Sequence, residues 1–322
     1  MRSPVEAREP HQIAIAPALG HRRTGWKETL KIAAYWWAGR RHVGRLSADE
    51  RDVTPLALGD RAHAVGVLAL VEAMAEGAPV SKPAGAALPL SAVKLDAPIP
   101  VPRRNIFCVG LNYRAHATEF ANSGAGGPRT PQQQVVPEFP VIFSKVPESV
   151  IAPEAAIRIP NGLSASIDYE AELAVVIGKT GTNIPPSRAM DHVWGYTIVN
   201  DVTARDLQRR HQQWLLGKSL DTFAPMGPWL ACTNELDGAR TRVRCWVNDE
   251  LRQDAPTEDL IFDIPTLIST ISAGITLYPG DIIATGTPAG VGIGFDPPKF
   301  LRRGDRVRIQ IEGIGTLSNP VQ

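Results

Sequence analysis

The sequence has few cysteines, no long apolar run and no excess of charge of either sign. Its 3 cysteines, Cys108, Cys232 and Cys245, are too few and too scattered for a disulfide framework or a zinc cage. No apolar segment approaches the ~20 residues that a membrane helix needs. With 34 Lys and Arg against 33 Asp and Glu, the net charge of +1 does not indicate a nucleic-acid-binding surface. These absences exclude a membrane span, argue against nucleic acid as a partner, and leave the cytoplasm as the default location.

Proline, in contrast, is abundant, and the first part of the chain differs in pattern from the rest. The 28 prolines and 28 glycines among 322 residues indicate short elements joined by many turns, as in a sheet-rich protein. Residues 1–26 lack a secretory signal and a clear periodicity, so we expect a loose leader there. A hairpin is predicted at Lys31–Leu46 and a helix at Ala62–Ala75, before a stretch rich in proline and alanine. We therefore predict a small N-terminal α+β domain over residues 27–100 and a larger domain over residues 101–322.

The larger domain is predicted to consist mainly of short strands. Apolar runs bounded by Gly, Pro, Asn or Asp recur along it, and one helix is expected at Ile264–Ala273. The expected strands are Ile106–Val109, Val141–Phe143, Leu173–Ile177, Tyr196–Val199, Val243–Val247, Ile282–Thr285 and Val307–Ile311. The fold class is accordingly α+β and rich in β-structure.

Acidic residues gather where one predicted strand begins and another ends. In DYEAEL, the alternation of a strand places Asp168, Glu170 and Glu172 on one face. Two carboxylates ~4–5 Å apart repel by roughly 4 kcal/mol at an effective dielectric of ~20, so such a stripe needs a proton, a basic side chain or a cation. Asp201 follows the next strand, GYTIVN. Glu170, Glu172 and Asp201 therefore form a candidate oxygen site for Mg²⁺ or Mn²⁺, with Ca²⁺ also possible. An exposed acidic strand face is the plainer alternative.

A candidate acid–base pair follows the first strand of the larger domain. In GLNYRAHATEF, His116 and Glu119 are three residues apart, so on one helical turn the carboxylate can orient the imidazole. The stretch Asn122–Glu138, which comes directly after Glu119, is rich in Gly, Pro and Gln. We interpret it as a lid over the substrate, with an ordinary surface loop as the alternative.

Groups suited to an anionic substrate lie further along the chain. Arg205 and Gln208 follow Asp201, and Lys218 lies in GKSLDTF. Cationic groups beside a metal suit a carboxylate-bearing substrate, although each could be a surface cation. Thr287 lies in the glycine-rich GTPAGVG, which matches neither a Walker motif nor a dinucleotide fingerprint. It is a candidate contact for a substrate carboxylate.

With these motifs in view, the chain resembles the fumarylacetoacetate hydrolase family. The matching motifs run from residue 105 to about residue 320 and include GLNYRAHATEF, FSKVPES, DYEAELAVVIGK, GYTIVNDVTARDLQ and YPGDIIATGTPAGVG. Two further segments, HQQWLLGKSLDTFAPMGP and DPPKFLRRGD, are most similar to the branch that contains the animal fumarylacetoacetate hydrolase domain-containing protein 2. The resemblance implies a mixed β-sheet roll, a homodimer and a divalent metal at each site.

The resemblance also implies roles for the candidates above, by position. The metal ligands are Glu170, Glu172 and Asp201. The groups that act on the substrate or bind it are His116, Glu119, Lys218, Arg205, Gln208 and Thr287. Asp168 can only support the ligands.

The activity expected from this resemblance is metal-dependent hydrolysis of a C–C bond in an acylpyruvate-type β-diketo acid, in aromatic catabolism. The His116–Glu119 pair would take a proton from water, hydroxide would add to the distal carbonyl, and the leaving carbanion would be held as an enolate at the metal. Because the same enolate serves other reactions, oxaloacetate tautomerisation or decarboxylation, and hydration or isomerisation of 2-oxo diacids, stay open. A non-catalytic scaffold that binds a metal or an oxo acid is a further alternative.

Overall fold

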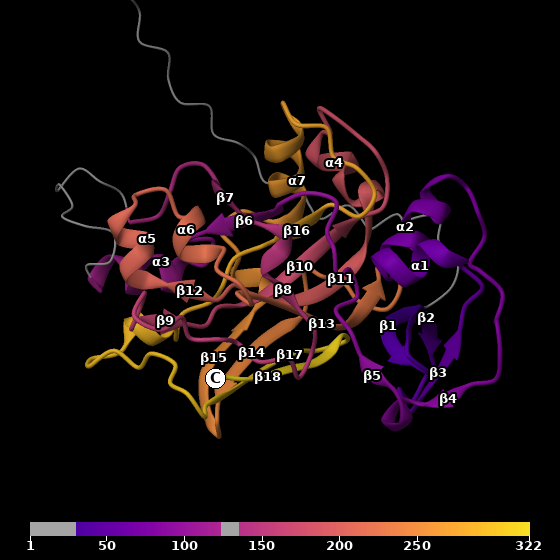
Figure 1. Ribbon diagram of the computed structural model, residues 1–322. Helices are drawn as coiled ribbons and strands as arrows, with labels where there is room; N and C mark the ends of the chain where they lie inside the picture. Colours follow the sequence, from indigo (N-terminus) through magenta and orange to yellow (C-terminus); the bar gives the residue numbers. More distant parts are fainter. Residues whose placement is uncertain (1–29, 124–134) are drawn as a thin grey trace, which may run out of the picture.

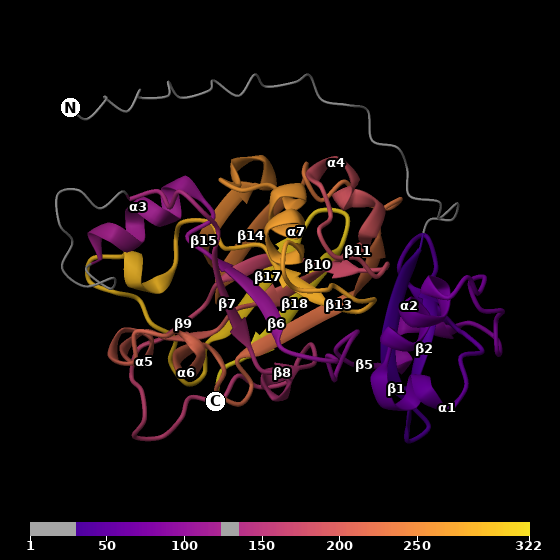
Figure 2. The ribbon, with the colours of Figure 1, turned by 90° about the horizontal axis from the view of Figure 1, so that it is seen from above.

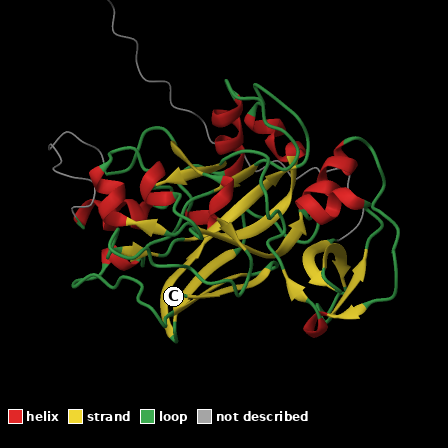
Figure 3. Cartoon of the chain, viewed as in Figure 1, coloured by secondary structure: helices red, strands yellow, loops and turns green. Residues whose placement is uncertain are grey.

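A computed structural model describes residues 30–123 and 135–322, so the predicted leader at residues 1–26 lies outside the described residues. One large mixed sheet, a four-stranded sheet and a two-stranded ladder account for most of the regular structure, with short helices around them (Figures 1 and 3). This arrangement confirms the β-rich α+β class.

The large sheet contains strands from both parts of the chain that the sequence distinguished. Its β1–β13 ladder pairs Ile32 with Leu230, so the N-terminal strands continue the main sheet through main-chain hydrogen bonds. In spatial order its strands are β4 (Leu88–Pro89), β3 (Asp52–Pro55), β2 (Arg40–Leu46), β1 (Lys31–Trp37), β13 (Ala224–Cys232), β11 (Val193–Asn200), β10 (Ala171–Ile177), β16 (Ile282–Ala284), β6 (Ile106–Gly110) and β7 (Val141–Lys145); β5 (Lys94–Leu95) pairs with β1 and β8 (Val150–Ile151) with β13. The division into domains near residue 100 stays a prediction.

The four-stranded sheet packs on one face of the large one. It consists of β15 (Glu250–Pro256), β14 (Arg242–Val247), β17 (Arg306–Ile311) and β18 (Gly315–Pro320). Every residue of β10 is buried, whereas β14 alternates between buried and half-buried residues. Side chains at alternate positions of β10 therefore serve two apolar clusters: Val175 packs in the one that includes Ile309 of β17, and Val176 in the one that includes Leu70. A strand covered on both faces explains the unbroken apolar run AVVI.

The helices are short and lie at the ends and edges of the sheets. They are α1 (Asp60–Val65), α2 (Leu68–Ala75), α3 (Arg114–Asn122), α4 (Pro186–Ala189), α5 (Arg205–Arg210), α6 (Leu215–Lys218) and α7 (Ile264–Ser272). Tighter helical turns are η1 (Leu90–Ala92), η2 (Pro147–Ser149), η3 (Met190–His192), η4 (Thr257–Asp259) and η5 (Gly292–Gly294). The small ladder pairs β9 (Ile167–Asp168) with β12 (Thr203–Ala204). In Figures 1 and 2, α3, α5 and α6 lie at the opposite end of the molecule from β1–β5, α1 and α2.

Most of the predicted elements are present, and one is corrected. The hairpin at Lys31–Leu46 and all seven strands of the larger part are confirmed, within three residues of their predicted ends. The single helix expected at Ala62–Ala75 is wrong, because the chain breaks into α1 and α2 at Gly66. Gly66 has a φ of 64°, and a Cβ there would lie 2.6 Å from the carbonyl oxygen of Pro98. The apolar periodicity continues through Gly66, but the chain turns there because the segment at Pro98 lies so close.

Candidate active site

The acidic triad lies where two central strands of the large sheet, β10 and β11, begin and end. Since β10 and β11 are antiparallel, with Ala171 opposite Asn200, the start of β10 and the end of β11 meet there. The N–H of Asp201 donates to the carbonyl of Glu170 at 2.9 Å, which joins the two strand ends. Glu170, Glu172 and Asp201 are buried, and each offers a carboxylate oxygen within 4.8 Å of the others. The fold thus brings together the three carboxylates that the sequence pattern singled out.

Buried cations surround the triad. Lys218 Nζ lies 2.6 Å from Glu170 Oε2 and 2.8 Å from Asp201 Oδ2. Lys145, at the end of β7, is fully buried, and its Nζ lies 2.6 Å from Asp201 Oδ1. Arg205 Nη2 lies 2.6 Å from Glu170 Oε1. Both oxygens of Glu170 and both oxygens of Asp201 therefore have a cationic neighbour.

The unbroken strand expected through Asp168, Glu170 and Glu172 is wrong, and Asp168 lies outside the group of carboxylates within 4.8 Å of one another. Tyr169 and Glu170 separate β9 from β10 and interrupt the strand. Asp168 instead accepts hydrogen bonds from the N–H groups of Gly292 at 2.6 Å and Ile293 at 3.0 Å. Its Oδ2 also accepts the Nε–H of Arg205 at 2.8 Å. Asp168 therefore ties the glycine-rich loop to the arginine that contacts Glu170.

The charges of this cluster fit a divalent cation. Burial raises the pKa of Glu172, and the neighbouring carboxylates of Asp201 and Glu170 raise it further, to well above its usual value. For Glu170, burial acts in the opposite direction to Lys218 and Arg205, but the cations prevail and lower its pKa to about 2. The buried acids Asp168, Glu170, Glu172 and Asp201 stand against the buried bases Lys145, Arg205 and Lys218.

With Glu172 protonated, the formal charge of these seven groups is zero. A divalent cation that replaced that proton would bring the formal charge to +1, which suits an anionic substrate. An oxygen-only donor set of this kind matches hard cations such as Mg²⁺ or Mn²⁺. The residues present can therefore hold the divalent metal that the resemblance implies.

The predicted acid–base pair is also assembled. His116 and Glu119 lie on α3, and His116 Nδ1 is 3.2 Å from Glu119 Oε2. The other carboxylate oxygen, Oε1, accepts the N–H of Gly290 at 2.9 Å. Gly294 packs so closely against Glu119 that a Cβ at that position would overlap the carboxylate. The glycine-rich loop thus fixes the carboxylate that orients the imidazole.

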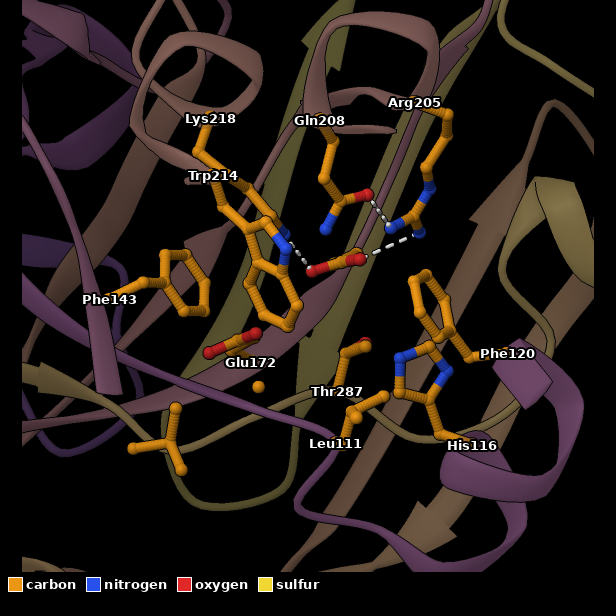
Figure 4. Close-up of a pocket in the computed structure, with 13 residues that line it drawn as sticks. Leu111, His116, Phe120, Phe143, Glu172, Arg205, Gln208, Trp214, Lys218 and Thr287 are labelled. Atoms are coloured by element: carbon orange, nitrogen blue, oxygen red, sulfur yellow. Dashed lines mark hydrogen bonds and ion pairs between the residues drawn. The ribbon is translucent and has the colours of Figure 1, made fainter. Parts of the chain in front are cut away.

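These groups line one pocket (Figure 4). Gln208 lies beside Arg205, and its Oε1 accepts a hydrogen bond from Arg205 Nη1 at 3.2 Å. Gly217 allows α6 to approach α5, because a Cβ there would lie 2.6 Å from the backbone nitrogen of Gln208. The lining residues are Val109, Gly110, Leu111, His116, Phe120, Phe143, Glu170, Glu172, Arg205, Gln208, Trp214, Lys218 and Thr287. The sequence candidates Asp201 and Glu119 are not among the lining residues, but they contact Lys218 and His116, which are.

Thr287 lines the pocket, but its hydroxyl is already engaged. It donates to the carbonyl of Ala171 at 3.0 Å and accepts from Gln253 Nε2 at 2.7 Å. The neighbouring N–H of Gly286 donates to Glu172 Oε2 at 2.9 Å. In this structure the turn therefore supports a candidate metal ligand, and a substrate carboxylate would have to compete for the Thr287 hydroxyl.

Sequence reasoning assigned no role to Lys145 or to the aromatic residues Phe143 and Trp214. Lys145 lies within FSKVPES, where a lysine ends an apolar strand. That position is a weak signal, because the other residues of β7 are half-buried or exposed and a lysine at the end of such a strand is usually solvated. The predicted lid at Asn122–Glu138 falls mostly on residues 124–134, which lie outside the described residues.

The fold and the pocket define a class of protein: a β-rich enzyme in which three buried carboxylates that could hold a divalent cation lie near a histidine–glutamate pair. The family model named fumarylacetoacetate (FAA) hydrolase C-terminal matches residues 105–322, and the chain belongs to the fumarylacetoacetate hydrolase family. This confirms the resemblance drawn from the motifs.

Curated relatives point to one branch of that family. The chain is 52% identical over 233 residues to oxaloacetate tautomerase YisK of Bacillus subtilis, covering 72% of this chain and 74% of the relative. It is 42% identical over 237 residues to the mitochondrial oxaloacetate tautomerase FAHD2A of Homo sapiens, covering 73% and 71%. These relatives confirm the branch that contains fumarylacetoacetate hydrolase domain-containing protein 2.

Solved structures share the fold over most of the chain. A fumarylacetoacetate hydrolase from Exiguobacterium antarcticum matches with a TM-score of 0.77 and 38% identity, covering 91% of this chain and 99% of that one. A 5-carboxymethyl-2-hydroxymuconate delta-isomerase from Mycobacterium smegmatis matches with a TM-score of 0.71 and 35% identity, covering 91% and 99%.

No helix within the described ranges is long and apolar enough to cross a membrane. The homodimer and the cytoplasmic location stay predictions.

Proposed function

We propose that this protein catalyses the keto–enol tautomerisation of oxaloacetate with a divalent cation as cofactor. The observation that carries the proposal is a cluster of three buried carboxylates beside a pocket that also holds His116 of a histidine–glutamate pair, in a chain 52% identical to a protein named oxaloacetate tautomerase. Tautomerisation moves one proton between C3 and the oxygen on C2 and breaks no carbon–carbon bond. A group that transfers protons and a site that stabilises negative charge are therefore sufficient.

Glu170, Glu172 and Asp201 would hold the cation. When bound, it would act as a Lewis acid that withdraws electrons from the 2-oxo group and the adjacent carboxylate. Lys218 and Arg205 place positive charge on the wall of the same pocket, where they would bind the substrate's carboxylates. Gln208 accepts from Arg205 through its amide oxygen, which leaves its NH₂ group to donate to the substrate.

His116 would move the proton. Glu119 accepts from Nδ1, so the ring keeps its hydrogen there and Nε2 is left to accept another. From the enol form, Nε2 takes the hydroxyl proton, the electron pair of the C2–C3 double bond moves to C3, and the imidazolium returns a proton to C3. Glu119, fixed by the N–H of Gly290, stabilises the charged ring between the two transfers.

Hydrolysis of an acylpyruvate, the activity expected first from the sequence, is the second candidate. Its support is the similarity to the Exiguobacterium antarcticum protein titled fumarylacetoacetate hydrolase, at 38% identity. In that reaction His116 would deprotonate a water molecule instead of the substrate. The tautomerase has the stronger support, because the more similar curated relatives carry that name.

The test is a direct assay of tautomerisation. Oxaloacetate is dissolved in its enol form, diluted into a weakly catalytic buffer with Mg²⁺ or Mn²⁺, and followed by the loss of enol absorbance and by product analysis. We expect enol decay above the rate of buffer and metal without enzyme, no pyruvate beyond that control, and loss of the enzymatic acceleration with a chelator. His116→Ala should reduce the rate by roughly 10²–10⁴-fold, the usual contribution of a general acid–base group.

His211→Ala is the matched control, because His211 is an exposed histidine at the end of α5. It should leave the rate unchanged. An enol decay no faster than the buffer's at saturating metal would refute the proposal. Pyruvate release would assign decarboxylation instead, and cleavage of acylpyruvates alone would assign hydrolysis. Binding of oxo acids without any turnover would favour a non-catalytic scaffold.

A further inference from the structure

One wall of the pocket is aromatic and is centred on Trp214. The indole packs against Phe143 with the rings 5.1 Å apart and 66° between their planes, and its centroid lies 6.4 Å from that of Phe120. In the view of Figure 4, Trp214 lies between Phe143 and Phe120, with Glu172 below the indole and Thr287 on the side toward His116. The polar groups of the pocket thus face a rigid apolar surface.

The same helical turn carries this wall and a catalytic candidate. Trp214 caps the N-terminus of α6, and the N–H of Lys218 donates to its carbonyl at 3.0 Å. Residues four apart on a helix share a face, so the indole and the Lys218 ammonium enter the pocket together. The position of the indole relative to the substrate's charged groups is therefore set by backbone geometry.

Gly110 provides the space in which the indole lies. A Cβ at Gly110 would overlap Cζ3 of Trp214 and lie 2.8 Å from Cη2. Gly110 is not among the glycines with positive φ, so its backbone does not need glycine for its conformation. The missing side chain at the end of β6 serves to admit the tryptophan.

The resulting pocket is small. Its cavity volume is about 10 Å³ in this structure, far below the roughly 300–1,000 Å³ usual for small-molecule sites. We propose that Trp214, seated against Gly110, is the specificity-determining residue that limits the chain length of the 2-oxo acid. This inference rests on the proposed function, because it takes the cationic wall to bind the oxo-acid end. The indole then borders the space that is left for the rest of the substrate, and it rejects acids longer than oxaloacetate.

The experiment uses oxaloacetate, 2-oxoglutarate and 2-oxoadipate, which differ by one methylene each. The two longer acids are measured as competitors of enol oxaloacetate turnover, and all three by calorimetric titration with Mg²⁺ present. The wild type should prefer the shortest acid by roughly tenfold or more for each methylene, the lower end of what a pocket achieves. Trp214→Ala should remove most of that preference, whereas Leu215→Ala, a change of the neighbouring residue that is 40% exposed, should retain it.

A double-mutant cycle tests whether Gly110 provides the space for the Trp214 indole. Gly110→Ala should lower kcat/KM for oxaloacetate at least tenfold in the wild type and have little effect in Trp214→Ala, since its methyl group collides with the indole. Trp214→Phe and a thermal unfolding scan of each variant separate loss of the wall from loss of folding.

An unchanged ranking of the three acids in Trp214→Ala, or an equal effect of Gly110→Ala in both backgrounds, would overturn the inference. If the wild type fails to tautomerise oxaloacetate, the proposed function falls. The calorimetric ranking then still decides whether Trp214 limits chain length.

Discussion

Replacing Lys145 by methionine is the sharpest test of how the acidic site is stabilised. The side chain is fully buried, and burial lowers its pKa. Its Nζ donates to Asp201 Oδ1 at 2.6 Å, to the carbonyl of Val202 at 3.1 Å and to the carbonyl of Lys218. Methionine keeps the apolar stem and removes these contacts. It leaves one carboxylate oxygen and two carbonyl oxygens without that donor in the interior.

The expected loss of stability is large. Removing one partner of a buried ion pair costs about 3–5 kcal/mol, because the remaining charge is left uncompensated. Asp201 keeps Lys218 at 2.8 Å from its other oxygen, so we expect the lower end, about 3 kcal/mol. At about 2 °C per kcal/mol, the value for large domains, the midpoint of thermal unfolding should fall by about 6 °C.

The assay is chemical and thermal unfolding with a chelator present, so that no cation replaces the lost ammonium. Lys299→Met is the matched control, because Lys299 Nζ also lies 2.6 Å from a carboxylate oxygen, that of Glu250, but both side chains are more than 40% exposed. An exposed pair contributes about 0–1 kcal/mol, so the control should change little. A loss below about 1 kcal/mol in Lys145→Met, or equal losses in the two variants, would refute the argument that burial makes this ion pair matter.

Two further predictions concern the metal site and the acid–base pair. Because the pKa of Glu172 is raised, the folded metal-free protein keeps the Glu172 proton above pH 4.5, where the unfolded chain loses it. The protonated carboxyl therefore contributes to the free energy of unfolding at low pH, and this contribution is lost as the pH rises through the raised pKa. Glu172→Gln should therefore stabilise the metal-free protein at neutral pH and abolish divalent-metal binding. Calorimetry of the wild type in buffers of different ionisation enthalpy should show proton release on metal binding, and a binding enthalpy independent of the buffer would contradict this. Gly294→Ala should displace Glu119 and lower kcat at least tenfold with little change in metal affinity, whereas Gly274→Ala, with nothing within 4 Å of its added Cβ, should behave as wild type. An unchanged kcat in Gly294→Ala would show that the position of Glu119 is not critical.

Local patterns in the sequence predicted the parts of the fold that depend on neighbouring residues. Alternation and apolar runs identified β10, β11, β14 and β17, because burial on one face or both leaves a period of two or an unbroken run. The candidate metal ligands were also predicted from the strand pattern. Glu170 and Glu172 are two residues apart, and Asp201 follows the strand that pairs with theirs.

Other features could not be predicted, because they depend on contacts between distant segments. The break between α1 and α2 follows from Pro98 approaching Gly66, and the departure of Asp168 from the acidic stripe follows from its bonds to Gly292 and Ile293. The position of the Trp214 indole depends on the space left by Gly110, more than a hundred residues earlier in the chain. No short-range pattern encodes such pairs.

Residue types at short spacings were thus enough to predict the family, the β-rich class, Glu170 with Glu172, and the histidine–glutamate pair, and the order of the predicted strands added Asp201. The fold was needed to see which cations neutralise the carboxylates, which backbone N–H groups hold Glu119 and Asp168, and how small the pocket is. The physical reason is that charge compensation and close packing act over a few ångströms in space, and the fold alone determines which residues come that close.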